Sequence, residues 1–211
     1  ILVTPSLDLD GAPLSQFEIV SGLLARGWLI KLCSARDGVL SKRYRDIGVD
    51  VLIEPLLVPS PAVAAWYERD VASLALRLAE IGPGLLFASS IDAFAAIDAA
   101  RIAGLTSAWN IREAADWRTR LADRHEHVAA RALAAFSYPT KLFFPSKASL
   151  QAWAEFTPKD RACVIYNAQP PIETPISEKR RLRARMAAGE EDFLIICVGT
   201  ICENKGQIDL V

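Results

Sequence analysis

Short apolar runs alternate along this chain with longer segments in which apolar side chains recur every three or four positions. The short runs are continuous over roughly four to six residues, a pattern typical of parallel strands that are buried on both faces. We therefore predict strands at residues 1–4, 29–34, 51–54, 85–88, 107–110, 141–144, 163–166 and 193–198.

The longer segments predict amphipathic helices, because spacings of three and four place side chains on one helical face. Gly27 ends the first helix and Gly82 ends the second. A third, alanine-rich helix begins near Asp92, after a capping pair of serines, and closes at Gly104. The two clearest apolar stripes are Leu14, Phe17, Val20 and Leu24, and then Val63, Tyr67, Val71, Leu74, Leu78 and Ile81.

Strands that alternate with helices predict an α/β fold, a Rossmann-like parallel sheet with helices on both faces. In such folds ligands bind beyond the carboxyl ends of the strands. The loops that matter for function are therefore those that follow Thr4, Ala88, Asn110, Phe144, Tyr166 and Val198.

The alternation of apolar runs and amphipathic segments stops near Ala168, which predicts a domain boundary there. Residues 1–168 are the first domain in this prediction, and a proline-bearing linker follows at 169–189. Residues 190–211 then begin a second Rossmann-like domain, and we expect the chain to end inside its first helix. We also expect the natural N-terminus to lie before Ile1.

The linker contains a strongly basic stretch at residues 179–185. It predicts either a solvated helix face, with Leu182 and Met186 turned inward, or a surface for nucleic acid or lipid. No aromatic residues interleave the charges, as stacking on single-stranded nucleic acid would require. We therefore favour the solvated helix.

Overall charge narrows the function classes. The 211 residues include 24 Lys and Arg against 25 Asp and Glu, and a net charge of −1 gives no general attraction for nucleic acid or anionic membrane. No apolar stretch is long enough to predict a transmembrane helix. We expect a cytoplasmic protein, with peripheral contact to the inner face of the membrane left open.

Cysteines and histidines give no pattern for a metal site or a nucleophilic triad. No Cys-x-x-Cys pair occurs, and both histidines, on a predicted polar helix face, stand far from the cysteines. We expect no metal and interpret the thiols as reduced and buried, as in a cytoplasmic protein. The four cysteines are Cys33, Cys163, Cys197 and Cys202.

The loop that carries Asp10, Gly11 and Ala12 joins the first strand to the first helix. Glycine lets the backbone approach a ligand closely, and a helix N-terminus attracts an anion. No GxGxxG and no GxxxxGK[ST] pattern occurs in the chain, so a simple dinucleotide site or P-loop loses support. A tight turn without a ligand is the alternative.

Arg112 and Glu113 follow the strand predicted at 107–110 and should emerge at the ligand edge. A guanidinium there can clamp a phosphate or a sugar hydroxyl. Glu113 either holds Arg112 in place or accepts a hydrogen bond from a sugar. The alternative is a surface ion pair that contributes little.

Two later loops carry further candidates. Ser146 either caps the next helix, which we favour, or touches a substrate. The strand predicted at 193–198 runs into Gly199 and Thr200, and Lys205 and Gly206 stand at the start of a helix. A lysine beside a helix N-terminus suits a diphosphate, although a solvated loop lysine is the alternative.

Taken in order, these segments resemble glycosyltransferase family 4, whose GT-B architecture has two Rossmann-like domains that face each other across a cleft. The run ending in Asn167 and the pair Lys205-Gly206 are the most specific elements. The matching segments are residues 10–13, 23–28, 47–51, 144–147, 164–168, 198–199 and 205–206.

The resemblance implies a retaining, metal-independent transfer from a nucleoside-diphosphate sugar, its co-substrate, to an acceptor such as a glycan, a lipid-linked group or a small molecule. It implies no cofactor and a place in polysaccharide biosynthesis. Residues 1–168 would be the acceptor side, with the remaining donor domain as its partner. Arg112 would be catalytic; Asp10, Gly11, Ala12, Glu113, Ser146 and Asn167 would bind substrate; and Gly199, Thr200, Lys205 and Gly206 would bind the donor diphosphate.

Several positions depart from the family pattern. Gly11-Ala12 stands where many members have two glycines, Thr200 where an arginine is frequent, and Arg112 where many have histidine. The acidic motif that holds the donor sugar would lie beyond Val211, so this fragment should be inactive alone. The alternatives are a GT-B nucleotide-sugar epimerase and a non-catalytic GT-B-like binding module.

Overall fold

Seven of the predicted strands form one parallel sheet in the computed structural model, with the order β3-β2-β1-β4-β5-β6-β7. The structure describes residues 1–58, 64–168, 175–199, 201 and 205–210. The strands are β1 (Leu2–Thr4), β2 (Lys31–Ser34), β3 (Asp50–Ile53), β4 (Leu85–Ser89), β5 (Thr106–Asn110), β6 (Lys141–Phe144) and β7 (Ala162–Val164). The order reverses between β1 and β4, which makes that point the topological switch of the sheet.

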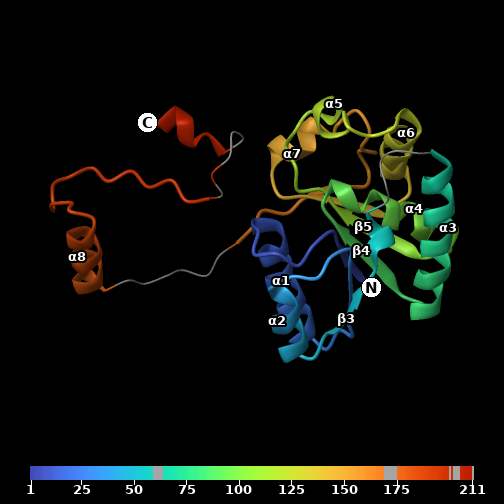
Figure 1. Cartoon of the computed structure of the whole chain (residues 1–211), viewed down its shortest axis with the longest axis horizontal. Coiled ribbons are helices and arrows are strands. Elements are labelled where there is room, and N and C mark those ends of the chain that lie inside the picture. The colour runs from blue at the N-terminus through green and yellow to red at the C-terminus, as the bar shows by residue number, and fades with distance from the viewer. Residues whose placement is uncertain (59–63, 169–174, 200, 202–204, 211) are drawn as a thin grey trace. The chain divides into compact units, whose positions relative to one another are not determined.

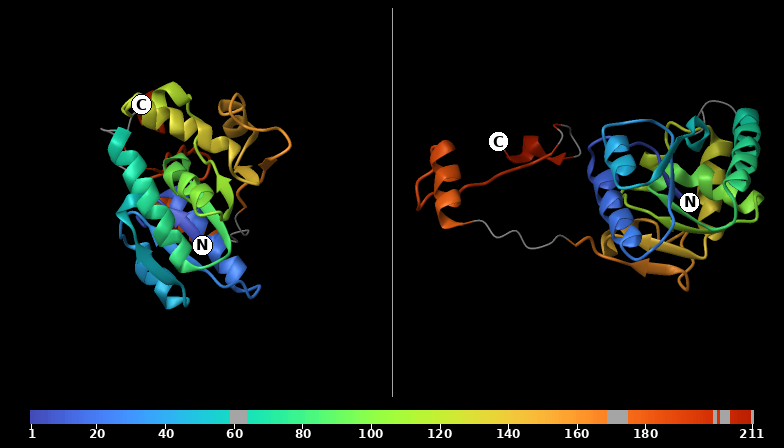
Figure 2. Two further views of the ribbon diagram at one scale, coloured as in Figure 1. Left: turned by 90° about the vertical axis from the view of Figure 1, so that its right-hand side faces the viewer. Right: turned by 90° about the horizontal axis from the view of Figure 1, so that it is seen from below.

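The chain divides into two units, Ile1–Asn167 and Ala168–Val211, and the sheet belongs to the first. Helices cover both faces of this sheet (Figure 1, Figure 2), which confirms the predicted α/β fold class. They are α1 (Gly11–Leu24), α2 (Leu40–Asp46), α3 (Ala64–Ile81), α4 (Phe94–Ile102), α5 (Trp117–Arg120), α6 (Glu126–Ala134) and α7 (Lys147–Ala152), with 3-10 turns η1 (Pro55–Leu57), η2 (Ile91–Ala93) and η3 (Ala135–Ser137).

Alternation along each central strand separates two hydrophobic cores. Leu2 of β1 packs with Phe17 of α1 and Tyr44 of α2, whereas its neighbour Val3 packs with Tyr67 of α3 and the α4 side chains. Successive strand side chains point to opposite faces, so a strand buried on both faces needs apolar residues at consecutive positions. The continuous apolar runs in the sequence have this cause.

A buried carboxylate joins three helices on the α3 face. Asp98 of α4 is fully buried, and it accepts hydrogen bonds from Tyr67 Oη at 3.0 Å and from the Arg101 guanidinium at 3.1 Å. The Nη2 atom of Arg131 on α6 lies 2.6 Å from it. Three donors compensate for the desolvation of one buried charge, and they fix α3, α4 and α6 relative to one another.

Several predicted boundaries are wrong by a few residues. Leu29 is 98% exposed and precedes β2, because the first helix ends in a turn at Gly27 with a φ of 81°. Glu54 follows β3 and caps η1, its carboxylate accepting from the Leu56 N–H at 3.1 Å. Edge strand β7 ends at Val164, so the predicted strand residues Ile165 and Tyr166 are exposed.

The cysteines do not all share one environment. Cys33 on β2 is buried, and burial raises the pKa of its thiol to about 11. Cys163 is half-buried, whereas Cys197 is exposed, which corrects the expectation that each thiol lies in a core. Cys202 lies outside the described residues.

The histidines lie at the start of α6. The predicted polar helix face is wrong for His125, which precedes the helix and caps it, its Nδ1 accepting from the His127 N–H at 3.2 Å. The Nε2 atom of His127 lies 2.6 Å from a carboxylate oxygen of Glu68 on α3.

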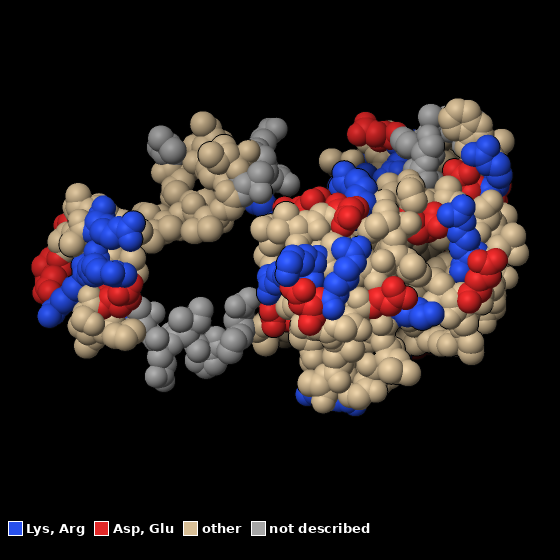
Figure 3. Space-filling view, turned by 60° about the horizontal axis from the view of Figure 1, so that its bottom comes forward, with Lys and Arg blue, Asp and Glu red and all other residues tan. Residues whose placement is uncertain are grey.

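In the second unit the basic stretch forms α8 (Ile176–Arg185). Arg180 pairs with Glu190 at 3.0 Å and Arg181 with Glu178 at 2.6 Å, while Arg183 Nη2 donates to the carbonyl of Asp192 at 2.7 Å. Local partners therefore hold several of these cations, as a solvated helix requires. Basic and acidic side chains also intermingle on the displayed surface of the first unit (Figure 3).

Two expectations for the second unit are wrong. Leu182 of α8 and Met186, which follows the helix, are exposed rather than turned into a core. Residues 193–198 form no strand, and Phe193 and Val198 are 91% and 89% exposed. A strand needs neighbouring backbone to satisfy its N–H and C=O groups, and the described residues of this unit include no strand to pair with it.

Candidate functional site

The N-terminus of α1 lies directly after β1, at the topological switch of the sheet. Asp10 precedes the helix in an extended conformation, and its side chain makes no capping hydrogen bond. Among the described residues, the N–H groups of Gly11 and Ala12 have no hydrogen-bond acceptor. Two free donors and the positive end of the helix dipole therefore face the carboxyl edge of the sheet.

Asn167 brings Arg112 together with the N-terminal part of α1. The Nη2 of Arg112 donates to Asn167 Oδ1 at 3.5 Å, and Ser15 Oγ donates to the same oxygen at 3.4 Å. Both hydrogen bonds are long, so neither holds its donor tightly. The segment after β5, the segment after β7 and the N-terminal part of α1 thus meet at one edge of the sheet.

Arg112 is half-buried, and burial lowers the pKa of its guanidinium, with the Glu113 carboxylate opposing that shift. A guanidinium remains charged even with a lowered pKa. Among the described residues, the side chain of Arg112 has one hydrogen-bond partner, the neutral amide oxygen of Asn167. The guanidinium is therefore able to exchange that partner for the oxygen of a phosphate or a sugar.

Glu113 is held on both its backbone and its side chain. Its Oε2 accepts from the Ile91 N–H at 3.0 Å and from the Arg112 N–H at 3.1 Å. Its carbonyl oxygen accepts from Trp153 Nε1 at 2.9 Å. Burial raises the pKa of the carboxyl, and the backbone donors oppose that rise. Two roles were predicted for Glu113, holding Arg112 in place or accepting a hydrogen bond from a sugar. The observed hydrogen bonds correspond to the first, because Glu113 holds the backbone of Arg112.

Ser146 caps α7, as predicted. Its Oγ accepts from the Ser149 N–H at 3.0 Å, and Ser149 Oγ accepts from the Ser146 N–H at 3.2 Å. This reciprocal pair is a capping box in which serine replaces the usual acidic residue. The side chain is committed to the helix terminus, which leaves its substrate contact a prediction.

The predicted diphosphate residues belong to the second unit. Gly199 and Lys205 are exposed, and Lys205 makes no ion pair with another described residue. Gly206 has a φ of 67°, and its carbonyl accepts from the Asp209 N–H at 3.1 Å at the start of η5 (Gln207–Leu210). Thr200 lies outside the described residues.

Two serines at the site were not among the predicted site residues. Ser15 contacts Asn167 from the N-terminal part of α1, and nothing in its local sequence distinguishes it from a solvated helix position. Ser90 was predicted only as a cap, which is confirmed by its Oγ accepting from the Asp92 N–H at 3.2 Å. Its φ of 72° is rare for a residue with a side chain, and it marks a strained turn directly after β4.

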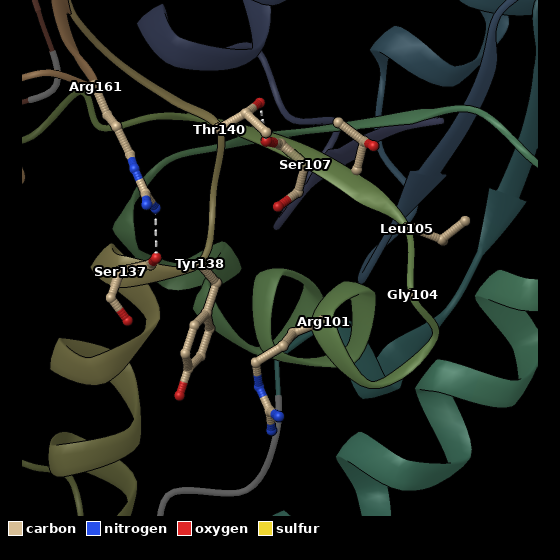
Figure 4. A pocket seen from close by; sticks show the side chains of 9 residues that line it. Arg101, Gly104, Leu105, Ser107, Ser137, Tyr138, Thr140 and Arg161 are labelled. Atoms are coloured by element: carbon tan, nitrogen blue, oxygen red, sulfur yellow. Dashed lines mark hydrogen bonds between the residues drawn. The ribbon is translucent and has the colours of Figure 1, made fainter.

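A cavity of about 470 Å³ lies at the opposite edge of the sheet, before β5 (Figure 4). Its arginines are already engaged: Arg161 Nη1 donates to the Ser137 carbonyl at 2.6 Å, and Arg101 donates to Asp98. The C-terminal ends of α4 and η3 point carbonyl groups to this edge, which disfavours an anion. We therefore place the candidate site at the carboxyl edge.

The described residues include neither a membrane-spanning helix nor a cluster of metal ligands. No helix among them has both the length and the apolar character needed to cross a membrane. No three His, Cys, Asp or Glu side chains among them gather closely enough to hold a metal ion.

Comparison with solved structures identifies the fold. The chain is similar to HepE of Anabaena in complex with UDP and glucose, with a TM-score of 0.62, 17% identity, and coverage of 88% of this chain and 49% of that one. It is similar to a glycosyltransferase from Rickettsia africae, with a TM-score of 0.58, 9% identity, and coverage of 90% and 50%. It is also similar to a UDP-GlcNAc 2-epimerase from Methanocaldococcus jannaschii, with a TM-score of 0.51, 11% identity, and coverage of 79% and 46%.

The chain therefore spans about half the length of the solved structures that it matches. No protein-family model and no curated protein sequence matches it. At these identities the likeness establishes the fold, a Rossmann-like parallel α/β sheet that matches those of GT-B structures.

Proposed function

We propose that this chain is the acceptor-side half of a glycosyltransferase that uses a nucleoside-diphosphate sugar. The observation that carries the proposal is the meeting of Arg112, Asn167 and the uncapped N-terminus of α1 at the switch point of the sheet. Ligands of open α/β sheets bind at this place. The likeness to structures of GT-B type, one of them holding UDP and glucose, supports it.

In this proposal the chemistry is transfer with retention and without a metal, as in glycosyltransferase family 4. The leaving diphosphate would be stabilised by fixed positive charge and N–H dipoles. Gly11 and Ala12 would supply N–H groups near the donor phosphates, with Asp10 and Asn167 lining the substrate. Arg112 would stabilise charge at the reacting sugar.

The donor is proposed to bind mainly to the domain that begins in the second unit. Gly199, Thr200, Lys205 and Gly206 would contact the diphosphate, with Lys205 as its cation. The acceptor is proposed to be a glycan, a lipid-linked group or a small molecule of surface-polysaccharide assembly. The proposed location is the cytoplasm, with peripheral contact to the inner membrane face left open.

A nucleotide-sugar epimerase is the second candidate, and the likeness to the Methanocaldococcus jannaschii 2-epimerase favours it. Such an enzyme would release nucleotide from its sugar without an acceptor. A transferase would release nucleotide in proportion to glycosylated acceptor. The ratio of the two products therefore separates these candidates.

The proposal is tested by calorimetry with a panel of nucleoside diphosphates and their sugars. The protein encoded by the complete gene should bind one nucleotide with a Kd of about 1 μM. Lys205→Ala should weaken that binding about tenfold, because a hydrogen bond to a charged group contributes about 1.5 kcal/mol. Lys159→Ala, at an exposed lysine of the first unit, is the matched control.

Two outcomes would count against this assignment. Equal affinity of wild-type protein and Lys205→Ala would remove Lys205 from the donor site. Failure of the complete protein to bind any nucleotide would favour a non-catalytic GT-B-like binding module.

A further inference from the structure

The loops after β4 and β5 are joined through a single carboxylate oxygen. Oε2 of Glu113 accepts the N–H of Ile91, the first residue of η2, at 3.0 Å. The same oxygen accepts the N–H of Arg112 at 3.1 Å. One side chain thus satisfies two backbone donors that no neighbouring strand reaches, and it ties two separate connections together.

The β4 side of this junction is a strained turn held by several hydrogen bonds. Ser90 has a φ of 72°, a conformation that side chains disfavour. Its N–H donates to the Asn110 carbonyl at 2.8 Å, and its own carbonyl accepts from Trp109 Nε1 at 2.8 Å. Trp109 is fully buried, so the hydrophobic core itself fixes this turn.

The β5 side of the junction leads directly to the candidate site. The backbone N–H of Arg112 is held by Glu113, and the guanidinium of Arg112 reaches Asn167 at 3.5 Å. Because that last contact is long, it holds the guanidinium only weakly. The backbone of Arg112 is held more firmly than its side chain. It is bonded to the Glu113 carboxylate, which also bonds the Ser90–Ile91 turn, and that turn is fixed by the buried Trp109.

We propose that Glu113 is a positioning residue, which clamps the Ser90–Ile91 turn to the Arg112 backbone so that the guanidinium faces Asn167 and the N-terminus of α1. This inference rests on the proposed function, because it assigns the aim of the clamp to a transfer site. In it Glu113 acts through Arg112 and makes no contact with the sugar. If Glu113 only orients Arg112, the reaction requires the size of its side chain and its acceptor oxygen. Its negative charge is then less important than that oxygen.

The test uses the complete protein with two substitutions. Glu113→Gln keeps an oxygen in place for both N–H groups, whereas Glu113→Ala removes it. Glu113→Ala should lower kcat about 100-fold, the effect of a misplacement of about 1 Å at a reacting centre. Glu113→Gln should stay within about tenfold of wild type, since an amide oxygen accepts the same bonds more weakly.

Two further readouts separate positioning from a loss of folding. The nucleotide Kd of both variants should stay near wild type, so that the loss falls on kcat. Glu113→Ala should unfold a few degrees below wild type, because two backbone N–H groups lose their acceptor, but it should remain folded at the assay temperature. Hydrogen exchange at the Ile91 and Arg112 amides should be slow in wild type and Glu113→Gln and faster in Glu113→Ala. Glu155→Gln, at an exposed residue on the same unit, controls for removal of a charge.

Equal loss of kcat in Glu113→Gln and Glu113→Ala would overturn the inference, because the carboxylate charge would then act on the substrate. Unchanged amide exchange in Glu113→Ala would overturn it as well. If wild-type protein transfers sugar from no nucleotide sugar, the proposed function fails instead. The exchange rates then decide the clamp alone: faster exchange in Glu113→Ala supports it and unchanged exchange refutes it.

Discussion

The two units of this chain treat similar sequences in opposite ways. In the first, the apolar run of β4 is paired on both sides, by β1 and β5, and Leu86 and Ala88 are fully buried. In the second, residues 193–198 are equally apolar but unpaired, and Phe193 and Val198 face solvent. Apolar character is therefore not enough to make a strand, and the neighbouring backbone decides the outcome.

This difference predicts that a core substitution in the first unit carries the largest effect on stability. Trp109→Ala should lower the free energy of unfolding by about 4 kcal/mol, because it opens a cavity among aromatic rings. The ring centroids of Trp109 and Phe136 lie 4.9 Å apart, and Trp109 Nε1 also donates to the Ser90 carbonyl. Urea unfolding of the 211-residue chain, followed by circular dichroism, measures this loss.

Trp66→Ala is the control for that measurement. Trp66 is half exposed on α3 in the same unit, so its removal should cost less than about 1 kcal/mol. If both tryptophan variants lost stability equally, the burial that distinguishes β5 from the surface of α3 would not be what stabilises the unit.

The smallest effect is expected in the second unit. Phe193→Ser should change the free energy of unfolding by less than about 0.5 kcal/mol, because the side chain is exposed. The same urea titration of the 211-residue chain checks it. A loss comparable with that of Trp109→Ala would show that residues 193–198 pack in solution and would remove the contrast between the units.

The sequence was a sound guide where structure depends on local pattern. Apolar runs predicted the sheet because Val3 and its neighbour Leu2 must fill two cores at once. Ser146 was correctly predicted as a cap, since capping depends on residues three positions apart. The run 193–198 was wrongly predicted, because pairing depends on partners that local pattern does not reveal.

The candidate site was predictable only in its parts. Placing Arg112 and Glu113 at the carboxyl edge followed from the end of β5, which the apolar run fixed. The contact of Asn167 with Ser15 joins residues 152 positions apart and depends on how β7 and α1 are placed. The strained turn at Ser90 is held by hydrogen bonds to the side chain of Trp109 and the backbone of Asn110. The local sequence has no turn motif from which this conformation could be predicted.

The most direct test of the central claim is sugar transfer by the complete protein with Arg112→Ala. Arg118→Ala, at an exposed arginine nearby in the chain, is the matched control. If the carboxyl edge of this sheet is the transfer site, Arg112→Ala should lower kcat about 100-fold through lost stabilisation of developing charge. The control should remain near wild type. Unchanged turnover in Arg112→Ala would contradict the placement of the site at this edge.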